Sequence, residues 1–271
     1  MNYRSNVRLT GNSASPLRGR ALVTGGTSGI GLAFARELAK RGCELVLLGR
    51  SLSRLEEQAR SFEEQGITCE ILQADLQTDE GIEKACDRLN SEDSPIEILV
   101  NNAGFGLHHK LATLDHEPLT QAIDVMATAT VRVGGAAGYA MAKRGHGVII
   151  NTASVSGLVP MGLYSGIKAL VRQWSRSLAI ELKPHGVQVM TFMPGWVRTE
   201  LHERSGISTS NLPNAIWLSA ERVARDCLHD VERGKTYSVP SKRFKVIAAL
   251  AEHAPRPAVE AVTSHINKGR D

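Results

Sequence analysis

The chain has 271 residues, of which 42% are hydrophobic and 22% charged, values typical of one large α/β domain or at most two small ones. Its formal net charge of +4 is small, and no basic run alternates with the few aromatic residues, which argues against a nucleic-acid-binding protein. No apolar run approaches the roughly 20 residues that a membrane-spanning helix needs, so no transmembrane segment is expected.

The four cysteines, Cys43, Cys69, Cys86 and Cys227, show no metal-binding or disulfide pattern. None pairs at a C-x-x-C spacing, and no histidine lies at a zinc-like distance from two of them. We therefore expect no metal site, and reduced, mostly buried thiols in a cytoplasmic protein.

The first 18 residues, "MNYRSNVRLTGNSASPLR", are polar, contain arginine and serine, and lack acidic side chains. This composition is shared by transit peptides and by flexible tails, and we favour a flexible tail ahead of the folded domain. Residues 19–240 are expected to form one domain, because no linker, repeat or low-complexity tract interrupts them. Residues 241–271 are expected to extend that domain with helix.

From Arg20 onward, short apolar runs alternate with helical stretches. The pattern predicts buried strands at 21–24, 44–48, 67–72, 97–100, 147–153 and 187–193, with a last strand at 235–240. It predicts helices near 30–41, 51–65, 79–91, 117–144 and 163–183. Repeated strand–helix units indicate an α/β protein with a single-domain Rossmann fold, a doubly wound parallel sheet of about seven strands flanked by helices.

The last part of the chain is less regular. Residues 199–233 are predicted to form loops and short helices. The tail at 241–268 has a helical pattern that could cover the fold, form a dimer contact or touch a membrane surface. Covering the fold is the default interpretation.

The segment "TGGTSGIG" links the first predicted strand to the first predicted helix. Gly25 allows a sharp turn, Gly29 allows close approach of a diphosphate, and Gly31 lets the helix pack near the strand. The N-terminus of that helix offers free N–H groups and a positive dipole end to phosphate. A plain tight turn is the alternative, but the strand–turn–helix setting favours a dinucleotide site.

The end of the second predicted strand, "LLGRSLSR", indicates which dinucleotide is bound. A site for NAD(H) carries an acidic residue here to hold the ribose 2′-hydroxyl, and this sequence has Arg50 instead. An arginine suits a 2′-phosphate, and the absence of a carboxylate removes its repulsion. The sequence therefore predicts NADP(H), unless Arg50 is only a solvated residue at the start of a helix.

The segment "YSGIK" places Tyr164 and Lys168 four residues apart, on one face of a helix. A nearby ammonium would lower the pKa of the phenol from its ordinary value of about 10. The phenol could then donate a proton to a carbonyl group, or accept one in the reverse reaction. Ser154, just past the fifth predicted strand, could hold the same carbonyl oxygen.

These motifs occur in a fixed order with "NNAG" at 101–104 and "PGWVRTE" at 194–200. In this order they resemble the short-chain dehydrogenase/reductase family over about residues 18 to 240. The segments "LVLLGRSLSRLEE" and "YSVP" resemble its NADP-dependent ketoacyl and carbonyl reductase branch. The resemblance implies an oxidoreductase that transfers hydride between nicotinamide C4 and a small carbonyl or alcohol substrate. It also implies a homodimer or homotetramer that pairs through the helices at 117–144 and 163–183.

The resemblance assigns roles residue by residue. It implies catalytic roles for Ser154, Tyr164 and Lys168, with Tyr164 as the general acid/base. Asn101, with Ala103 and Gly104, would run along the adenosine side of the cofactor and steady the sheet. It implies cofactor contacts from Gly25, Thr27, Ser28, Gly29, Ile30, Gly31, Arg50, Asp75, Leu76, Asn102, Ala103, Gly104, Tyr164, Lys168, Pro194, Gly195, Val197 and Thr199.

Two features depart from the family pattern. Met126 stands where the family usually has an asparagine, which helps to link the lysine to solvent through water. Ser154 precedes Tyr164 by ten residues, about three fewer than in the family, and Ser156 is the fallback for its role. These departures keep a second interpretation open: an NADP(H)-binding regulatory or scaffold protein with weak or no turnover.

Overall fold

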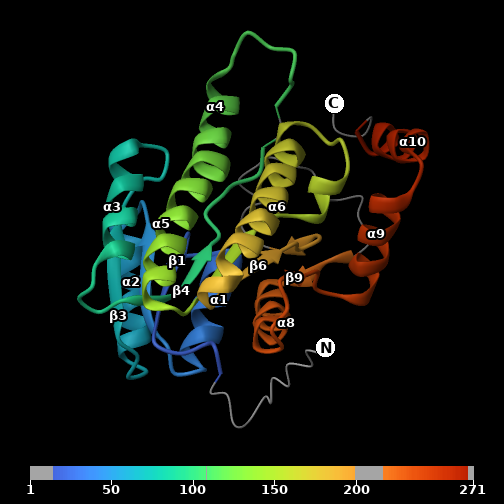
Figure 1. Ribbon diagram of the computed structural model, residues 1–271. Coiled ribbons are helices and arrows are strands. Elements are labelled where there is room, and N and C mark those ends of the chain that lie inside the picture. Colours follow the sequence, from blue (N-terminus) through green and yellow to red (C-terminus); the bar gives the residue numbers. More distant parts are fainter. Residues whose placement is uncertain (1–14, 108, 199–215, 268–271) are drawn as a thin grey trace, which may run out of the picture.

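A seven-stranded parallel sheet lies at the centre of the computed structural model, which describes residues 15–107, 109–198 and 216–267 (Figure 1). The strands are β1 (Arg20–Thr24), β2 (Glu44–Gly49), β3 (Cys69–Gln73), β4 (Ile96–Asn101), β5 (Gly147–Thr152), β6 (Val187–Phe192) and β9 (Tyr237–Ser238). Their order across the sheet is β3-β2-β1-β4-β5-β6-β9, and every pair is parallel. The order reverses between β1 and β4, the position at which sheets of this kind open a crevice for ligands.

The strands are apolar along nearly their whole length because both faces of the sheet are covered. Alternate residues enter two separate cores. In β1, for example, Val23 packs on one face and Leu22 on the other. Helices α1 (Gly29–Ala39), α2 (Leu52–Glu63) and α8 (Ala220–Glu232) cover the first face, and α3 (Asp79–Asn90), α5 (Ala129–Arg144) and α6 (Leu163–Leu182) cover the second. The predicted doubly wound sheet is confirmed.

The helix predicted at 117–144 contains an interruption that the sequence did not indicate. It begins as α4 (Glu117–Ile123), widens into a π-helical turn at Asp124–Thr128, and continues as α5 to Arg144. Gly145 ends it in the left-handed conformation, with φ of +78°. Single π-helical turns occur frequently at functional sites, and this one contains Met126.

The prediction of loops and short helices for residues 199–233 is wrong at its C-terminal end, because α8 has 13 residues. The Ser219 hydroxyl caps α8 by accepting a hydrogen bond from the Arg222 backbone N–H. Its buried side chains include Val223, Cys227 and Val231, spaced at four residues. Many charged residues on the opposite face of "AERVARDCLHDVE" obscured this periodicity.

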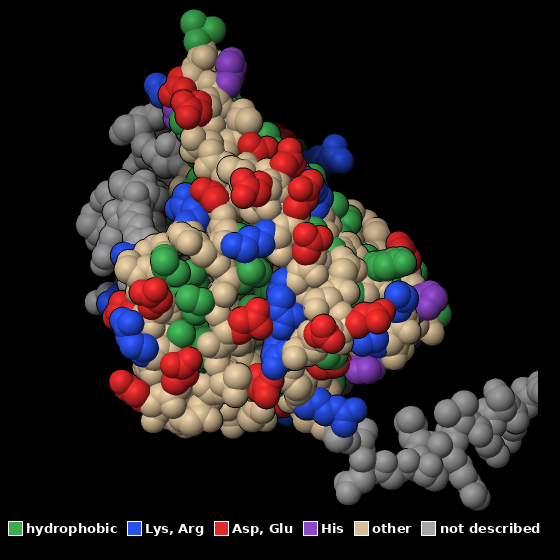
Figure 2. Space-filling model, turned by 90° about the vertical axis from the view of Figure 1, so that its left-hand side faces the viewer, with side chains coloured by type: hydrophobic (Ala, Val, Ile, Leu, Met, Phe, Trp, Pro, Cys, Tyr) green, Lys and Arg blue, Asp and Glu red, His purple; other side chains and the backbone are tan. Residues whose placement is uncertain are grey.

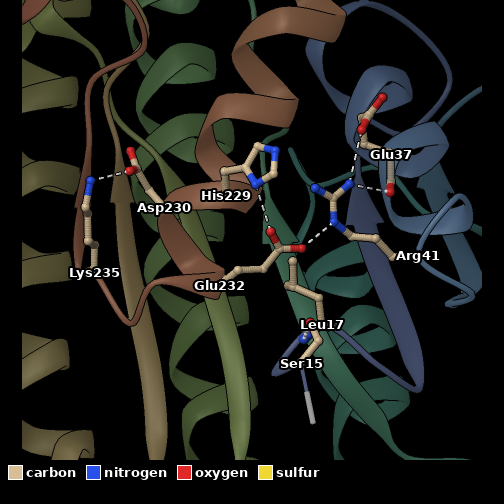
Figure 3. Close-up of polar contacts among 8 residues, drawn as sticks. All are labelled: Ser15, Leu17, Glu37, Arg41, His229, Asp230, Glu232 and Lys235. Atoms are coloured by element: carbon tan, nitrogen blue, oxygen red, sulfur yellow. Dashed lines mark hydrogen bonds and ion pairs between the residues drawn. The ribbon is translucent and has the colours of Figure 1, made fainter. Parts of the chain in front are cut away.

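A polar contact fixes α8 against α1 (Figure 3). The Arg41 guanidinium donates to the carboxylate of Glu232 at 2.7 Å and to that of Glu37 at 3.1 Å. Burial alone would raise the pKa of Glu37, but hydrogen bonds from Lys40 and Arg41 outweigh it and lower that pKa. One arginine therefore joins the C-terminal ends of two helices that are far apart in the chain.

The C-terminal extension is helical, as predicted, with α9 (Lys242–His253) and α10 (Arg256–Asn267) at the right-hand edge of Figure 1. A small parallel sheet of β7 (Val197–Arg198) and β8 (Leu218–Ser219) was not predicted. It brackets residues 199–215, which include Thr199 and lie outside the described residues, as do residues 1–14, 108 and 268–271. Within the described part of the chain, no helix is long and apolar enough to cross a membrane.

Candidate active site

A cleft of about 490 Å³ opens at the carboxyl ends of the strands, where the strand order reverses. Nearly all the predicted site residues line it: Gly25, Thr27, Ser28, Gly29, Ile30, Arg50, Asp75, Leu76, Asn102, Ala103, Gly104, Ser154, Tyr164, Lys168, Pro194, Gly195 and Val197. Gly31 is buried beneath the lining, and Thr199 lies outside the described residues. Val125 and Thr152 also contribute to the lining and had no signal in the sequence, and Phe105 and Met126 complete it on the same side as Tyr164.

The glycine-rich turn after β1 forms a cradle made of backbone. Gly25 and Gly29 have φ of +64° and +53°, the left-handed region that favours glycine. A Cβ atom at Gly31 would lie 2.2 Å from the Gly25 carbonyl oxygen, so only glycine fits there. The α1 N-terminus has no acidic residue in its first turn and no side-chain cap, which leaves its N–H groups available to an anion. The turn therefore fits a diphosphate.

Thr24, which the sequence analysis did not assign, joins the ends of β1 and β4. Its hydroxyl accepts hydrogen bonds from the backbone N–H groups of Asn102 at 2.8 Å and Ala103 at 2.9 Å. The Asn102 side chain donates in return to the Thr24 carbonyl at 3.2 Å. Asn101 does not line the cleft, so the expected contact with the adenosine side of the cofactor is not supported for this residue. Its side chain is buried and donates to the Thr130 carbonyl at 2.8 Å, a contact that can steady the sheet.

Arg50 and Asp75 lie at the outer end of the cleft, beyond β2 and β3. Arg50 is exposed, and its carbonyl accepts a hydrogen bond from Gln73 at 3.1 Å, which ties the loop after β2 to β3. The Asp75 carboxylate accepts from the Gln77 backbone N–H at 3.0 Å. The cationic Arg50 side chain therefore stands at the rim, where a cofactor phosphate could reach it.

The inner end of the cleft holds the proposed catalytic residues. Tyr164 and Lys168 occupy the first two turns of α6, and the Lys168 ammonium lies 5.5 Å from the centre of the Tyr164 ring. The Lys168 Nζ donates to the Thr152 carbonyl at 2.9 Å, which anchors it to the end of β5. The Ser154 hydroxyl is close enough to Tyr164 to interact with its hydroxyl. The shortened loop thus still brings Ser154 to Tyr164.

Ser156 supports Ser154 rather than replacing it. The two residues belong to a 3-10 turn at Val155–Leu158, for which Ser154 is the N-cap. The Ser154 Oγ accepts from the Ser156 backbone N–H at 3.1 Å and lies 2.9 Å from the Ser156 Oγ. These contacts fix the rotamer of Ser154 at the edge of the cleft.

The pKa of Tyr164 shifts in the direction opposite to the expectation from sequence. Burial raises it to about 12, and the smaller effect of the Ser154 hydroxyl lowers it. Burial likewise lowers the pKa of Lys168 to about 8. Desolvation disfavours the charged form of both groups, the phenolate of Tyr164 and the ammonium of Lys168. Tyr164 is therefore held in its protonated form at neutral pH.

One wall of the cleft is apolar and includes Met126. Met126 is fully buried in a cluster with Ala122, Ala127 and Ile167, and Tyr164 packs against that cluster. Phe105, Leu107, Val125 and Leu163 complete it. A Cβ atom at Gly104 would lie 3.2 Å from the Met126 sulfur, so the thioether fills the space beside the backbone of "NNAG". Met126 is thus a packing residue in this wall.

Comparison with known proteins agrees with this geometry. The family model for short chain dehydrogenase matches residues 20–208. The very-long-chain 3-oxoacyl-CoA reductase of Anas platyrhynchos is 35% identical over 195 residues, which cover 68% of this chain and 62% of that reductase. The match therefore spans less than two thirds of that relative's length.

Two solved structures have the same fold. The short-chain dehydrogenase from Sphingobium yanoikuyae in complex with NADPH is 31% identical, with a TM-score of 0.79 over 85% of this chain and 92% of that one. The bulky-bulky ketone specific alcohol dehydrogenase from Comamonas testosteroni is 29% identical, with a TM-score of 0.74 over 85% and 91%. The chain belongs to the short-chain dehydrogenase/reductase family of oxidoreductases.

Proposed function

We propose that this protein is an NADPH-dependent carbonyl reductase, or the corresponding alcohol dehydrogenase, with Tyr164 as its general acid/base. The observation that carries the proposal is the arrangement of one cleft. A backbone cradle for a diphosphate lies at one part of it, and Ser154, Tyr164 and Lys168 lie at another. A nucleotide and a reacting carbonyl could therefore occupy the cleft side by side.

The cleft fits NADPH in several respects. The glycine turn would receive the diphosphate, and Arg50 would receive the 2′-phosphate, because β2 ends without a carboxylate that would repel it. Pro194, Gly195 and Val197 lie beside the catalytic residues, where they could hold the nicotinamide. A related dehydrogenase was solved in complex with NADPH. When bound, NADPH would supply a hydride from nicotinamide C4.

Side chains of this protein would supply the proton and stabilise the charge that its transfer leaves behind. Tyr164, with a pKa of about 12, is protonated at neutral pH and can donate to a carbonyl oxygen that gains negative charge. The Ser154 hydroxyl would donate a hydrogen bond to the same oxygen, since Ser156 orients it from behind. The Lys168 ammonium, 5.5 Å from the ring, would stabilise the phenolate that remains.

The substrate wall supports neutral, apolar carbonyl compounds as the substrate class. The cluster of Phe105, Leu107, Val125, Met126 and Leu163 beside Tyr164 contains no charged side chain. The loop "SVSGLVPMGL" that precedes Tyr164 has none either. A charged group facing this wall would lose hydration without gaining an ionic partner from these residues. The name of the Comamonas testosteroni relative, specific for bulky ketones, points in the same direction.

The proposal is tested by following NADPH consumption with bulky ketones, aldehydes, quinones and 3-ketoacyl thioesters. Wild-type protein should reduce neutral apolar carbonyls, and Tyr164→Phe should lower kcat about 1,000-fold while the Kd for NADPH stays within about twofold. Normal turnover by Tyr164→Phe would remove the tyrosine from its role. Tight NADPH binding without turnover of any substrate would instead support a regulatory or scaffold protein.

Self-association through α5 and α6 remains part of the proposal. Tyr139 of α5, and Leu170 and Ile180 of α6, are large exposed apolar residues on these two helices. Their exposure supports a homodimer or homotetramer in which α5 and α6 of two copies pack together. Light scattering of the purified protein tests this, and a monomer at all concentrations would contradict it. The cytoplasmic location remains a prediction.

A further inference from the structure

Helix α9 carries large apolar side chains on two opposite faces. Its inner face is buried through Phe244 and Ala248. The outer face exposes Val246, Ile247 and Leu250, with 60%, 50% and 63% of their surfaces accessible. A helix that is apolar on both sides is normally covered on both sides. The outer face of α9, defined by these three residues, therefore has the chemistry of a surface that meets a partner.

The charges of α9 are arranged unequally along it. Its first turn contains the exposed residues Lys242, Arg243 and Lys245, whereas Glu252 is its one acidic residue and lies near the other end. Glu252 forms an ion pair with Arg172 of α6, which offsets its charge. Asp230 of α8 interacts with Lys245 and offsets part of that charge. The helix thus presents an apolar stripe beside an end that carries three basic residues and no acidic residue of its own. This combination is complementary to a negatively charged surface with an apolar interior.

The basic residues beside the stripe favour a lipid surface as its partner. A few apolar side chains inserted at the headgroup boundary act together with nearby basic residues when the lipids are anionic. Val246, Ile247 and Leu250 supply the apolar side chains, and the first turn of α9 supplies the basic residues. An anionic lipid surface is therefore the occupant that fits both the apolar side chains and the charge.

We propose that the outer face of α9 docks this protein on the surface of an anionic lipid bilayer. The inner face of α9, opposite the docking face, lies against the cleft. The Phe244 ring packs against Gly195, where an added Cβ atom would lie 2.3 Å from the ring, and α9 contacts the 3-10 turn after Ser154. Docking through α9 would thus hold the cleft near the membrane. The proposal concerns location and does not depend on the reductase activity.

The test is co-sedimentation of the full-length protein with lipid vesicles. Binding to vesicles of phosphatidylglycerol and phosphatidylcholine should be at least about fivefold stronger than binding to phosphatidylcholine alone. Binding to the anionic vesicles should also fall at least about fivefold when salt is raised from about 0.05 M to 0.5 M. The variant Val246→Ser/Leu250→Ser should lose at least about fivefold in binding, and so should Lys242→Glu. Circular dichroism melting checks that each variant is folded.

The chain offers a matched control in the loop between β4 and α4, which forms the projection at the top of Figure 2. Leu111 and Leu114 are 60% and 97% exposed there, so Leu111→Ser/Leu114→Ser removes at least as much exposed apolar surface as Val246→Ser/Leu250→Ser. Its vesicle binding should stay within about twofold of wild type. Equal loss in the control, or equal binding to neutral and anionic vesicles, would overturn the proposal. Conversion of a dimer to a monomer by Val246→Ser/Leu250→Ser would assign the face to a second copy instead.

Discussion

The cofactor end of the cleft is made mainly of backbone, whereas the substrate end is made of apolar side chains. At the cofactor end, Gly25, Gly29 and Gly31 form a turn in which side chains would clash or strain the backbone. At the substrate end, Phe105, Met126 and Leu163 meet from three separate segments. A steric requirement for glycine is visible in a short sequence, but a wall built from distant segments is not.

Tyr164 and Lys168 lie where the two ends of the cleft meet, and they combine a property set by the local sequence with one set by the tertiary structure. Their spacing on one helix is local, and the sequence predicted it. Their protonation depends on burial by the surrounding fold, and the sequence-based expectation for the pKa of Tyr164 had the wrong direction. For these two residues, the local sequence therefore sets the spacing on the helix, and the tertiary structure sets the protonation state.

The largest effect is expected from Gly31→Ala at the cofactor end. The new Cβ atom would lie 2.2 Å from the Gly25 carbonyl oxygen, a backbone atom that cannot move without opening the turn. We expect the Kd for NADPH to rise at least about 100-fold and the melting temperature to fall. As a control, Gly135→Ala in α5 meets open space and should stabilise the protein by about 0.5–1 kcal/mol. An undisturbed Kd in Gly31→Ala would contradict the cradle.

Arg50→Ala removes a positive charge from the cofactor end of the cleft and leaves the shape of the glycine turn unchanged. Loss of a charge-assisted contact to the 2′-phosphate should raise the Kd for NADPH about 10- to 100-fold, and the Kd for NADH should stay within about threefold. Fluorescence titration with both nucleotides measures the difference. If both affinities fall equally, Arg50 does not read the 2′-phosphate.

Met126→Asn tests whether the substrate end is governed by packing. From the sequence, an asparagine at this position would leave activity unchanged or raise it if the water relay to the lysine is the limiting step. The fully buried position of Met126 instead predicts a loss of about 1–3 kcal/mol in the free energy of unfolding, because the amide would be buried in an apolar cluster. Met126→Leu should cost less than about 1.5 kcal/mol. Unchanged stability with a higher kcat in Met126→Asn would contradict the packing role.

At the place where the two ends meet, Lys168→Met in the cofactor-free protein is expected to change stability by an amount that depends on pH. The folded-state pKa of Lys168, about 8, lies below the ordinary value of 10.5, so the unfolded chain binds more protons between these pH values. Wild-type stability should therefore gain from this group as pH rises from 8 to 10.5. Lys168→Met should be more stable at pH 7, by on the order of 1–3 kcal/mol, and this advantage should shrink toward pH 10.

Urea unfolding at several pH values measures this difference. The pKa of Tyr164 is raised in both proteins, so its own contribution, which is lost as pH rises from about 10 to 12, largely cancels in the comparison. A difference in stability that does not change with pH would show that the Lys168 ammonium is not desolvated in the folded state.

Most of the architecture could be predicted because its signals are local. Each main strand is a short apolar run, and its position in the structure agrees with the prediction to within about two residues. The missed elements depend on context. The π-helical turn at 124–128 has no local signal, and the pair of β7 and β8 joins residues that are far apart in the chain.

The candidate site likewise contains residues that local motifs predicted and contacts that depend on tertiary context. The sequence predicted Ser154, Tyr164 and Lys168, and the structure brings them to one end of a cleft. It could not show that Ser156 supports Ser154, because that contact depends on how the 3-10 turn folds. The sequence also left the role of Met126 open, because a methionine can be exposed, packed in a core or part of a binding site. The apolar neighbours of Met126 in the structure show that it is packed.

By itself, the sequence determined the order of strands and helices, the glycine turn and the four-residue spacing of Tyr164 and Lys168. These properties follow from backbone sterics and helical periodicity, which act over a few residues. The tertiary structure alone decided the apolar wall around Met126, the direction of the pKa shifts and the exposed outer face of α9. Each of the three depends on which side chains are buried and which stay exposed, and that depends on which distant segments the fold brings together.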